Sequence, residues 1–355
     1  MINYGGSSDP FFRGRHFITL DDFTKEEVDV MLDVARDLKI KFYRGEPTPL
    51  LLYKVLFLIF FDQSTRTRNS MEAGIAQLGG TGIFLSPDKM QIAHGESARD
   101  TAIILSRFGD GIGIRHCTFG VGNRYIRSIA ENSRAPVMNL QDDVYHPFQA
   151  LADLMTIQER FGKDLRGLKV TISWAYAKSH LKPLSVPQSQ ILLFTRFGME
   201  VTLAYPEKFD LMPDIVEKAK KNAEEHGGKL NIVHDMDEGF KDADVVIPKN
   251  WGGFFVLGNA EELLSMDPAE AMNVLKENEK LIWEETEKHK DWIADERRMS
   301  LAKKHAIYMH ALPADRGREV VDSVIDGPQS VVFDEAENRI HTAKAVMALL
   351  MGGRM

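Results

Sequence analysis

Residues 57–80 read "FLIFFDQSTRTRNSMEAGIAQLGG", and this stretch decides how the fold is interpreted. An apolar run stops at a Ser-Thr-Arg-Thr-Arg turn, and a helical pattern follows with Met71, Ile75 and Leu78 on one side. A turn made for structure alone favours Gly, Asn or Asp. This one carries two arginines and three hydroxyls, which indicates a ligand with negative charge.

The same alternation of apolar run and helical pattern extends along the whole chain. Apolar runs separated by helices predict parallel sheets covered on both faces. We therefore expect an α/β protein with two doubly wound parallel-sheet domains, joined by a bridging helix at 146–162. The predicted strands are 54–61, 81–87, 111–115 and 135–140 in the first half, and 167–176, 199–206, 229–235, 244–250 and 306–313 in the second.

The bulk composition is that of an ordinary globular protein. The 355 residues are 44% hydrophobic and 27% charged, and this length favours two domains. A net charge of −8 argues against nucleic acid as the main partner. No apolar run is long enough for a membrane span, and the N-terminus lacks a signal-peptide core, so we expect a cytoplasmic location. Cys117 is the single cysteine, which permits no internal disulfide and no cysteine-built metal site.

The turn at 64–67 has the features of a phosphate site. A turn after a parallel strand presents the N–H groups of the next helix, and those donors together with the helix dipole favour a phosphate. Arg66 can add a bidentate contact, while Ser64, Thr65 and Thr67 supply hydroxyl donors. The alternative is a hydroxyl N-cap flanked by exposed arginines.

Further polar residues stand at the ends of predicted strands. Arg115 ends "GIGIR" and His310 ends "YMH". His146 and Gln149 lie three residues apart in "HPFQ", so both can point to one side of a helix that begins at Pro147. A single histidine is more often a packed or surface residue than a catalytic one, and both readings stay open here.

Four motifs, "STRTR", "HPFQALAD", "HALP" and "FDEAENR", resemble in order and spacing the signature segments of the aspartate/ornithine carbamoyltransferase family. The resemblance covers nearly the whole chain. It implies an enzyme that transfers a carbamoyl group from carbamoyl phosphate to an amine, without metal or cofactor. It also implies a carbamoyl-phosphate-binding domain at 1–150 plus 338–355, a second-substrate domain at 151–337, and a homotrimer.

The resemblance also implies roles for individual residues. Arg66, Arg115 and His146 would be catalytic, with Arg115 and His146 on the carbonyl oxygen of carbamoyl phosphate, assisted by Thr67. Gln91, in the loop "MQIAHGES", would reach the ligand of a neighbouring subunit. The full set implied for carbamoyl phosphate is Ser64, Thr65, Arg66, Thr67, Gln91, Arg115, His146, Gln149, the backbone carbonyl of Leu312, and Arg339.

The acceptor segments depart from the ornithine enzymes. "PKNWGGFF" replaces their Asp-containing Ser-Met-Gly loop, and Ala311 replaces the cysteine of their His-Cys-Leu-Pro segment. Ordinary ornithine is therefore not the expected acceptor. Residues 171–206 resemble instead the knotted branch of the family, which includes N-acetylornithine, N-succinylornithine and YgeW-like members, in which a proline-containing loop forms a trefoil knot.

Within that branch, Lys249 and Trp251 match a Lys-x-Trp element for the second substrate. Lys249, His180 and Lys182 could bind a carboxylate, although His180 and Lys182 are equally well read as solvated loop charges; His310 completes the expected set. The YgeW-like resemblance implies that a ureido acid could be the partner, cleaved with phosphate to yield carbamoyl phosphate.

Two other classes are weighed against this interpretation. A nucleotide-binding dehydrogenase needs a Gly-x-Gly-x-x-Gly turn after a strand, and "GIGIRHCTFGVG" does not fit, because its first glycines lie within the strand. An inert homologue that kept the phosphate pocket but lost turnover is disfavoured by the intact set of Arg66, Arg115, His146 and Gln149. An N-acylornithine carbamoyltransferase is a less favoured alternative within the family.

Overall fold

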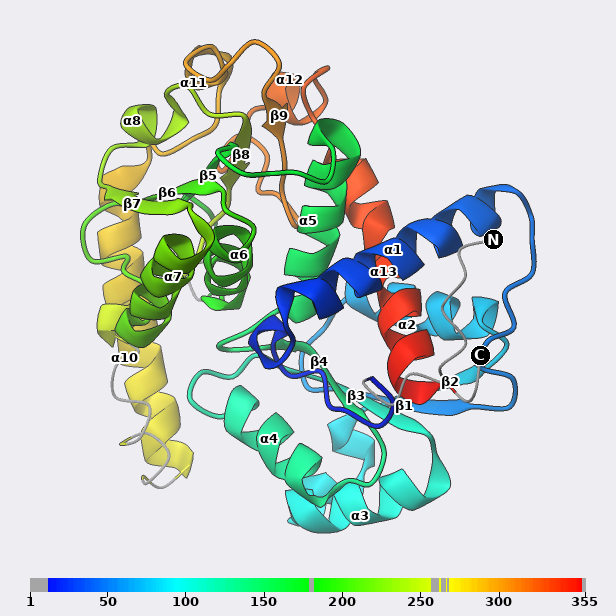
Figure 1. Ribbon diagram of the computed structural model, residues 1–355. Helices are drawn as coiled ribbons and strands as arrows, with labels where there is room; N and C mark the ends of the chain where they lie inside the picture. Colours follow the sequence, from blue (N-terminus) through cyan, green and yellow to red (C-terminus); the bar gives the residue numbers. More distant parts are fainter. Residues whose placement is uncertain (1–11, 179–181, 257–261, 263–265, 267, 353–355) are drawn as a thin grey trace. The chain divides into compact units, whose positions relative to one another are not determined.

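The computed structural model describes residues 12–178, 182–256, 262, 266 and 268–352 (Figure 1). The chain divides into two compact units. The first unit comprises Met1–Cys117, Gly122–Asp142 and Arg339–Met355, and the second comprises Thr118–Val121 and Asp143–Asn338.

The first unit is built on a parallel four-stranded sheet in the order β2-β1-β3-β4. The four strands predicted in the first half are confirmed, as β1 (Val55–Phe60), β2 (Thr81–Leu85), β3 (Gly111–His116) and β4 (Val137–Asp142). The chain moves outward from β1 to β2 and then crosses to β3 on the other side. In open α/β sheets, ligand sites lie at the carboxyl ends of the two strands between which the order reverses, and these are β1 and β3 here.

Helices cover both faces of this sheet. They are α1 (Lys25–Tyr43), α2 (Arg66–Gln77), α3 (Ala98–Phe108), α4 (Gly122–Asn132) and the second part of α13 (Val332–Met351), with short 3-10 turns η1 (Leu20–Asp22), η2 (Pro87–Lys89) and η3 (Gln91–His94). Ile126 and Ile129 of α4 and Ala102 of α3 pack on the sheet residues Ile112 and Ile114.

Helix α13 packs against α2 on its apolar side. A Cβ added at Gly74 of α2 would lie 3.0 Å from the Met347 Cε atom, so the absent side chain permits the close approach. The apolar side of α13 belongs to the core, since each of four residues at helical spacing is at most 1% exposed: Ala343, Val346, Met347 and Leu350.

The second unit contains a parallel five-stranded sheet in the order β7-β6-β5-β8-β9, which reverses between β5 and β8. Its strands are β5 (Lys169–Ser173), β6 (Glu200–Ala204), β7 (Lys229–Val233), β8 (Val245–Pro248) and β9 (Ile307–Tyr308). The prediction of a strand at 306–313 was too long. The last hydrogen bond to β8 is donated by the Met309 N–H to the Val246 carbonyl at 3.0 Å, and the N–H groups of His310 and Leu312 donate instead to the Glu335 and His310 side chains.

The helices of the second unit follow the predicted alternation. They are α5 (Pro147–Phe161), α6 (Ser185–Arg196), α7 (Pro213–His226), α8 (Met236–Phe240), α10 (Pro268–Thr286), α11 (Glu296–Met299), α12 (Asp322–Ile325) and the start of α13, with η4 (Phe254–Val256) and η5 (Glu287–His289). Gly227 is the C-cap residue of α7 and adopts the left-handed conformation (φ 73°).

Two sequence predictions concern residues 179–181. His180 lies outside the described residues, and so does part of the loop expected to form the knot, so both stay predictions. Among the residues that the structure describes, no helix combines the length and the apolarity needed to cross a membrane.

Candidate active site

The Ser-Thr-Arg-Thr turn lies at the carboxyl end of β1, at the point where the sheet order reverses. Helix α2 begins at Arg66, and Thr65 is its N-cap residue, but the Thr65 side chain makes no capping hydrogen bond. The Ser64 hydroxyl accepts one long hydrogen bond of 3.3 Å from the Thr67 N–H. A hydroxyl cap therefore accounts for one contact only, and the helix start retains donors that can receive an anion.

Two guanidinium groups gather at this end of the sheet. Arg115 on β3 is in register with Phe60, the last residue of β1. Its Nη1 donates to Oε1 of Gln141 on β4 at 2.5 Å. The pKa of Arg66 is lowered, first by its burial and then by the positive charge of Arg115. A bound anion would offset both unfavourable contributions.

A third arginine contacts the turn from α13. The Nη2 atom of Arg339 donates to the Thr67 hydroxyl at 3.1 Å, and the two residues are 4% and 3% exposed. Gln91 opens η3 and is exposed on the first unit. The first unit thus brings together Arg66, Arg115, Thr67 and Arg339 of the predicted set.

His146 and Gln149 belong to the second unit. His146 is the N-cap residue of α5, and its backbone N–H donates to the Ser189 hydroxyl at 2.8 Å. Gln149 is 2% exposed, and its Nε2 donates to Oδ1 of Asp153 at 2.7 Å and to Oε1 of Glu335 at 3.0 Å.

His310 has a defined protonation pattern in the turn after β9. Its Nδ1 accepts a hydrogen bond from the Leu312 N–H at 2.9 Å, so the neutral ring carries its proton on Nε2. That Nε2 lies 3.3 Å from Oε2 of Glu319, without hydrogen-bond alignment. Burial lowers the pKa of His310 and outweighs the opposing effect of Glu319. The ring is therefore held as a neutral imidazole.

Glu319 joins the segments predicted to bind the second substrate. It is fully buried and accepts from the Asn250 N–H at 2.8 Å and from the Asp315 N–H at 2.7 Å. The Lys182 Nζ atom lies 3.3 Å from Oε1 of Glu319, the oxygen that also accepts from Asn250. Burial alone would raise the pKa of Glu319, but the nearby Nε2–H group of His310 and the positive charges of Lys182 and Lys249 hold it well below its usual value.

Lys249 and Trp251 follow β8 in the same region. The Lys249 N–H continues the sheet pattern by donating to the Ser173 carbonyl at 2.8 Å. Trp251 is fully buried, and its indole N–H donates to the Phe209 carbonyl at 2.8 Å. The Trp251 ring is thus an internal part of the wall that supports this loop.

Sequence reasoning missed four acidic or amide side chains that hold the predicted residues. Asp153 lies four residues after Gln149 on a predicted helix, and this spacing was an available signal. Glu335 lies within the quoted motif "FDEAENR", but its partners Gln149 and His310 are distant in sequence, as are the Asn250 and His310 neighbours of Glu319. Gln141 could be found only from the register of β3 against β4.

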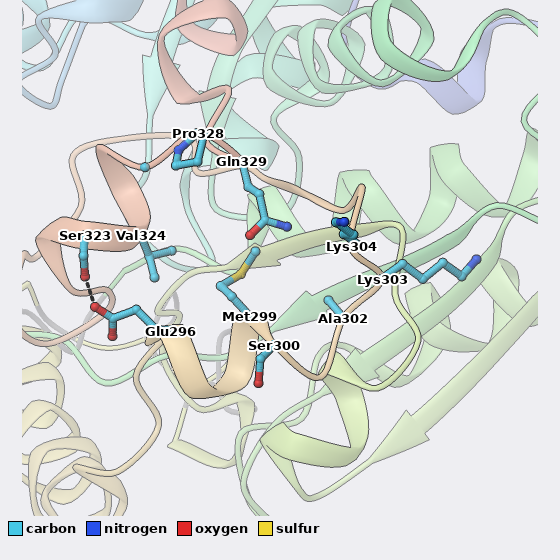
Figure 2. Close-up of a pocket in the computed structure, with 11 residues that line it drawn as sticks. Glu296, Met299, Ser300, Ala302, Lys303, Lys304, Ser323, Val324, Pro328 and Gln329 are labelled. Atoms are coloured by element: carbon cyan, nitrogen blue, oxygen red, sulfur yellow. Dashed lines mark hydrogen bonds between the residues drawn. The ribbon is translucent and has the colours of Figure 1, made fainter.

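Two cavities in the described part of the chain lie away from the predicted site residues. One, of about 470 Å³, is in the second unit between α11, α12 and the loop before β9, and Figure 2 shows its lining by Met299, Lys303, Lys304 and Gln329 among others. The other, of about 400 Å³, lies in the first unit at the amino ends of the strands, near Lys54. Neither is lined by a predicted site residue.

The described residues form two α/β units with parallel sheets, and in the first unit arginines and a hydroxyl-rich turn lie at one strand end. The family description "Aspartate/ornithine carbamoyltransferase, carbamoyl-P binding domain" matches residues 15–159, and the "Asp/Orn binding domain" of the same family matches 182–350. The chain belongs to the aspartate/ornithine carbamoyltransferase family, a family of enzymes.

Relatives within the family carry several names. The "Putative carbamoyltransferase YgeW" of Escherichia coli strain K12 is 39% identical over 343 residues, covering 91% of this chain and 86% of that protein. An ornithine carbamoyltransferase of Thermococcus kodakarensis is also 39% identical, over 96% of this chain and 97% of that protein. Sequence identity to this chain is thus the same for the YgeW protein and for this ornithine carbamoyltransferase.

Solved structures share the fold. Ornithine carbamoyltransferase of Pyrococcus furiosus superposes with a TM-score of 0.81 at 36% identity, over 96% of this chain and 98% of that one. Acetylornithine transcarbamylase complexed with acetylcitrulline superposes with a TM-score of 0.82 at 32% identity, over 96% and 100%.

Proposed function

We propose that this protein moves a carbamoyl group between carbamoyl phosphate and the amine of an amino-acid-like or ureido-acid substrate other than ordinary ornithine. The observation that carries the proposal is the turn at 64–67, in which α2 starts with an uncapped N-cap residue beside Arg66 and Arg115. A carbamoyl phosphate dianion is the ligand that this arrangement and the family favour together.

The proposal divides the work between two domains. Residues 1–150 with 338–355 would bind carbamoyl phosphate, and residues 151–337 would select the acceptor. Ser64, Thr65, Arg66 and Thr67 would hold the phosphate. The 3.1 Å contact from Arg339 to the Thr67 hydroxyl supports a fixed orientation of that hydroxyl before the ligand arrives.

The chemistry follows from the charges that develop. A neutral amine attacks the carbonyl carbon, the C–O bond to phosphate breaks, and negative charge builds on the carbonyl oxygen. Arg115, His146 and Thr67 would donate to that oxygen, and such preorganised donors are typically the largest catalytic contribution. The departing phosphate can take the proton that the amine loses, so no protein base is assigned.

The acceptor assignment rests on the loop after β8 and the turn after β9. Lys182 already lies 3.3 Å from Glu319 and 3.7 Å from Asp315, so its charge is largely offset. Lys249 also acts on Glu319, so the assignment of the second substrate's carboxylate to Lys249 rests on the Lys-x-Trp element that it forms with Trp251. His310, held as a neutral ring, would serve as a hydrogen-bonding group and not as a cation.

Single-turnover transfer from labelled carbamoyl phosphate tests the proposal. The acceptors are ornithine, acylated ornithines, diamino acids and ureido acids, the last offered in phosphate for the reverse reaction. Transfer to an acceptor other than ornithine is expected. Preferred transfer to ornithine would overturn the acceptor assignment, and binding without transfer to any compound would favour the inert homologue.

A pair of variants on one helix tests the phosphate turn. Arg66→Ala should lower kcat/KM by at least about 100-fold, because it removes a charged contact to the phosphate. Arg68→Ala is the matched control, since the Arg68 guanidinium pairs with Glu72 at 3.3 Å and lies over the Phe84 ring. Equal activity of both variants would refute the assignment of the turn.

A further inference from the structure

The amide of Gln149 is held by two buried carboxylates in the second unit. Its Nε2 donates to Oδ1 of Asp153 at 2.7 Å and to Oε1 of Glu335 at 3.0 Å. Both acids are fully buried. An ionised carboxylate only accepts hydrogen bonds, so the NH2 side of the amide must face the two acids. A 180° flip would set the amide oxygen against both carboxylates.

Neither carboxylate can turn away, because each is fixed by a second donor. The other oxygen of Asp153 accepts from Nε2 of Gln190 at 2.7 Å. The other oxygen of Glu335 accepts from the backbone N–H of His310 at 2.8 Å. The orientation of the Gln149 amide therefore follows from a network that is rigid before any ligand binds.

The same network reaches Leu312. Glu335 binds the N–H of His310, and the His310 ring in turn accepts the N–H of Leu312 at 2.9 Å. Glu335 thus links Gln149 to the turn that carries the Leu312 carbonyl. These are the two acceptors proposed for the amide group of carbamoyl phosphate.

We infer that Asp153 and Glu335 are positioning residues that make the protein select a carbamoyl group over an acyl group. By fixing the NH2 of Gln149, they set its Oε1 as the acceptor side of the amide. Two acceptors recognise the NH2 donor of carbamoyl phosphate and give nothing to the methyl group of acetyl phosphate. This inference rests on the proposed function.

The first test uses the wild-type protein and compares its affinity for carbamoyl phosphate, acetyl phosphate and inorganic phosphate by calorimetry. Carbamoyl phosphate should bind at least about tenfold more tightly than acetyl phosphate, because two hydrogen bonds distinguish them. Equal affinities would overturn the inference and leave the proposed function intact. Failure to bind carbamoyl phosphate at all would instead refute the proposed function.

The second test removes the constraint on the amide. A single Asp153→Asn or Glu335→Gln change leaves the other acid to orient Gln149, so each should reduce the carbamoyl-to-acetyl affinity ratio by no more than about threefold. In the double variant either face of Gln149 can be accommodated, and the ratio should fall by at least about tenfold. Affinity for acetyl phosphate and inorganic phosphate should stay unchanged.

A purely structural role would weaken all three ligands equally, and that result, or an unchanged ratio in a folded double variant, would overturn the inference. The matched control is the double variant Asp164→Asn/Glu225→Gln, which neutralises two exposed acids of the same unit. Its affinity ratio should equal that of the wild type. If the double variant does not fold, the two single variants decide the matter, and equal weakening of all three ligands in either of them would overturn the inference.

Discussion

At the scale of single residues, two buried charges are handled in opposite ways. Glu319 is fully buried but receives two backbone N–H groups and lies 3.3 Å from Lys182. Lys344 is 1% exposed, and its Nζ donates to the neutral Gln77 amide at 3.0 Å and lies 5.1 Å from the Phe42 ring centre. The negative charge of Glu319 is thus offset by the positive charge of Lys182, whereas the positive charge of Lys344 faces an amide dipole and an aromatic ring.

We expect Lys344→Met to stabilise the protein at pH 7. Burial lowers the pKa of Lys344 from 10.5 to about 8, so the folded state holds its proton less firmly than the unfolded chain. Wild-type stability should therefore rise between pH 8 and 10.5. The gain of the variant, on the order of 1 kcal/mol at pH 7, should shrink over that window.

Urea denaturation at pH 7 and pH 10 measures this difference, with Lys220→Met, an exposed lysine of α7, as the control. The control should show no pH-dependent gain. A Lys344→Met variant that is less stable than the wild type at pH 7 would contradict the argument.

Glu319→Gln should destabilise the protein at pH 7 by about 2 kcal/mol, because one backbone N–H then faces an NH2 group and Lys182 keeps only the more distant Asp315 carboxylate at 3.7 Å. The pKa of Glu319 is lowered on folding, so its contribution is present above the unfolded value of 4.5 and is lost as the pH falls below it. Denaturation at pH 7 and at pH 4 should show the gap between variant and wild type narrowing at the lower pH.

At the scale of secondary structure, local chemistry decides where helices end. Gly227 terminates α7 with φ 73°, and a Cβ there would meet no atom within 4 Å. Gly227→Ala should therefore cost about 1 kcal/mol from backbone strain alone. Gly227→Asn should cost less, because Asn tolerates this conformation. Thermal unfolding of both variants checks the order, and an Ala variant as stable as the Asn variant would contradict it.

The strands illustrate what an apolar run can and cannot predict. β1 and β3 appear where their runs predicted them, because both faces of a central parallel strand are buried. β9 is only two residues long, although its apolar run continues. An apolar run reports burial and not strand pairing: His310 is 1% exposed, but its N–H donates to the Glu335 side chain and not to a strand.

At the scale of the whole molecule, the proposed trimer with Gln91 serving a neighbouring subunit makes a distinct prediction. Arg66→Ala and Gln91→Ala should each be inactive alone. After mixing equal amounts and exchanging subunits, about a quarter of sites should combine an intact Arg66 with an intact Gln91 from the next subunit. Activity assays before and after exchange, with sedimentation to check assembly, measure the recovery.

The control mixes Arg66→Ala with Arg115→Ala, both of which lie in the first unit near one turn. That mixture should recover nothing, because no subunit then supplies both arginines. Recovery in the control, or none in the Gln91 mixture, would show that each site is built from one subunit.

The sequence by itself determined the alternation of strands and helices, the polar turn at 64–67 and the positions of Arg115, His146, Gln149 and His310. These are local signals, since apolar periodicity and residues at strand ends are read within a few positions of one another. Gly227, the C-cap residue of α7, is also a local signal, because a glycine at the end of a helical pattern is read within one turn.

Only the tertiary structure decided which buried acids hold those residues in place. Glu335 accepts from Gln149 across 186 positions of the chain, and Asp153 accepts from Gln190 across 37. Such pairs depend on how α5, α6 and α13 pack, which no local pattern encodes. The sequence of a carboxylate residue does not record whether its side chain is solvated or buried. Burial makes the hydrogen bonds of the carboxylate directional and costly to break.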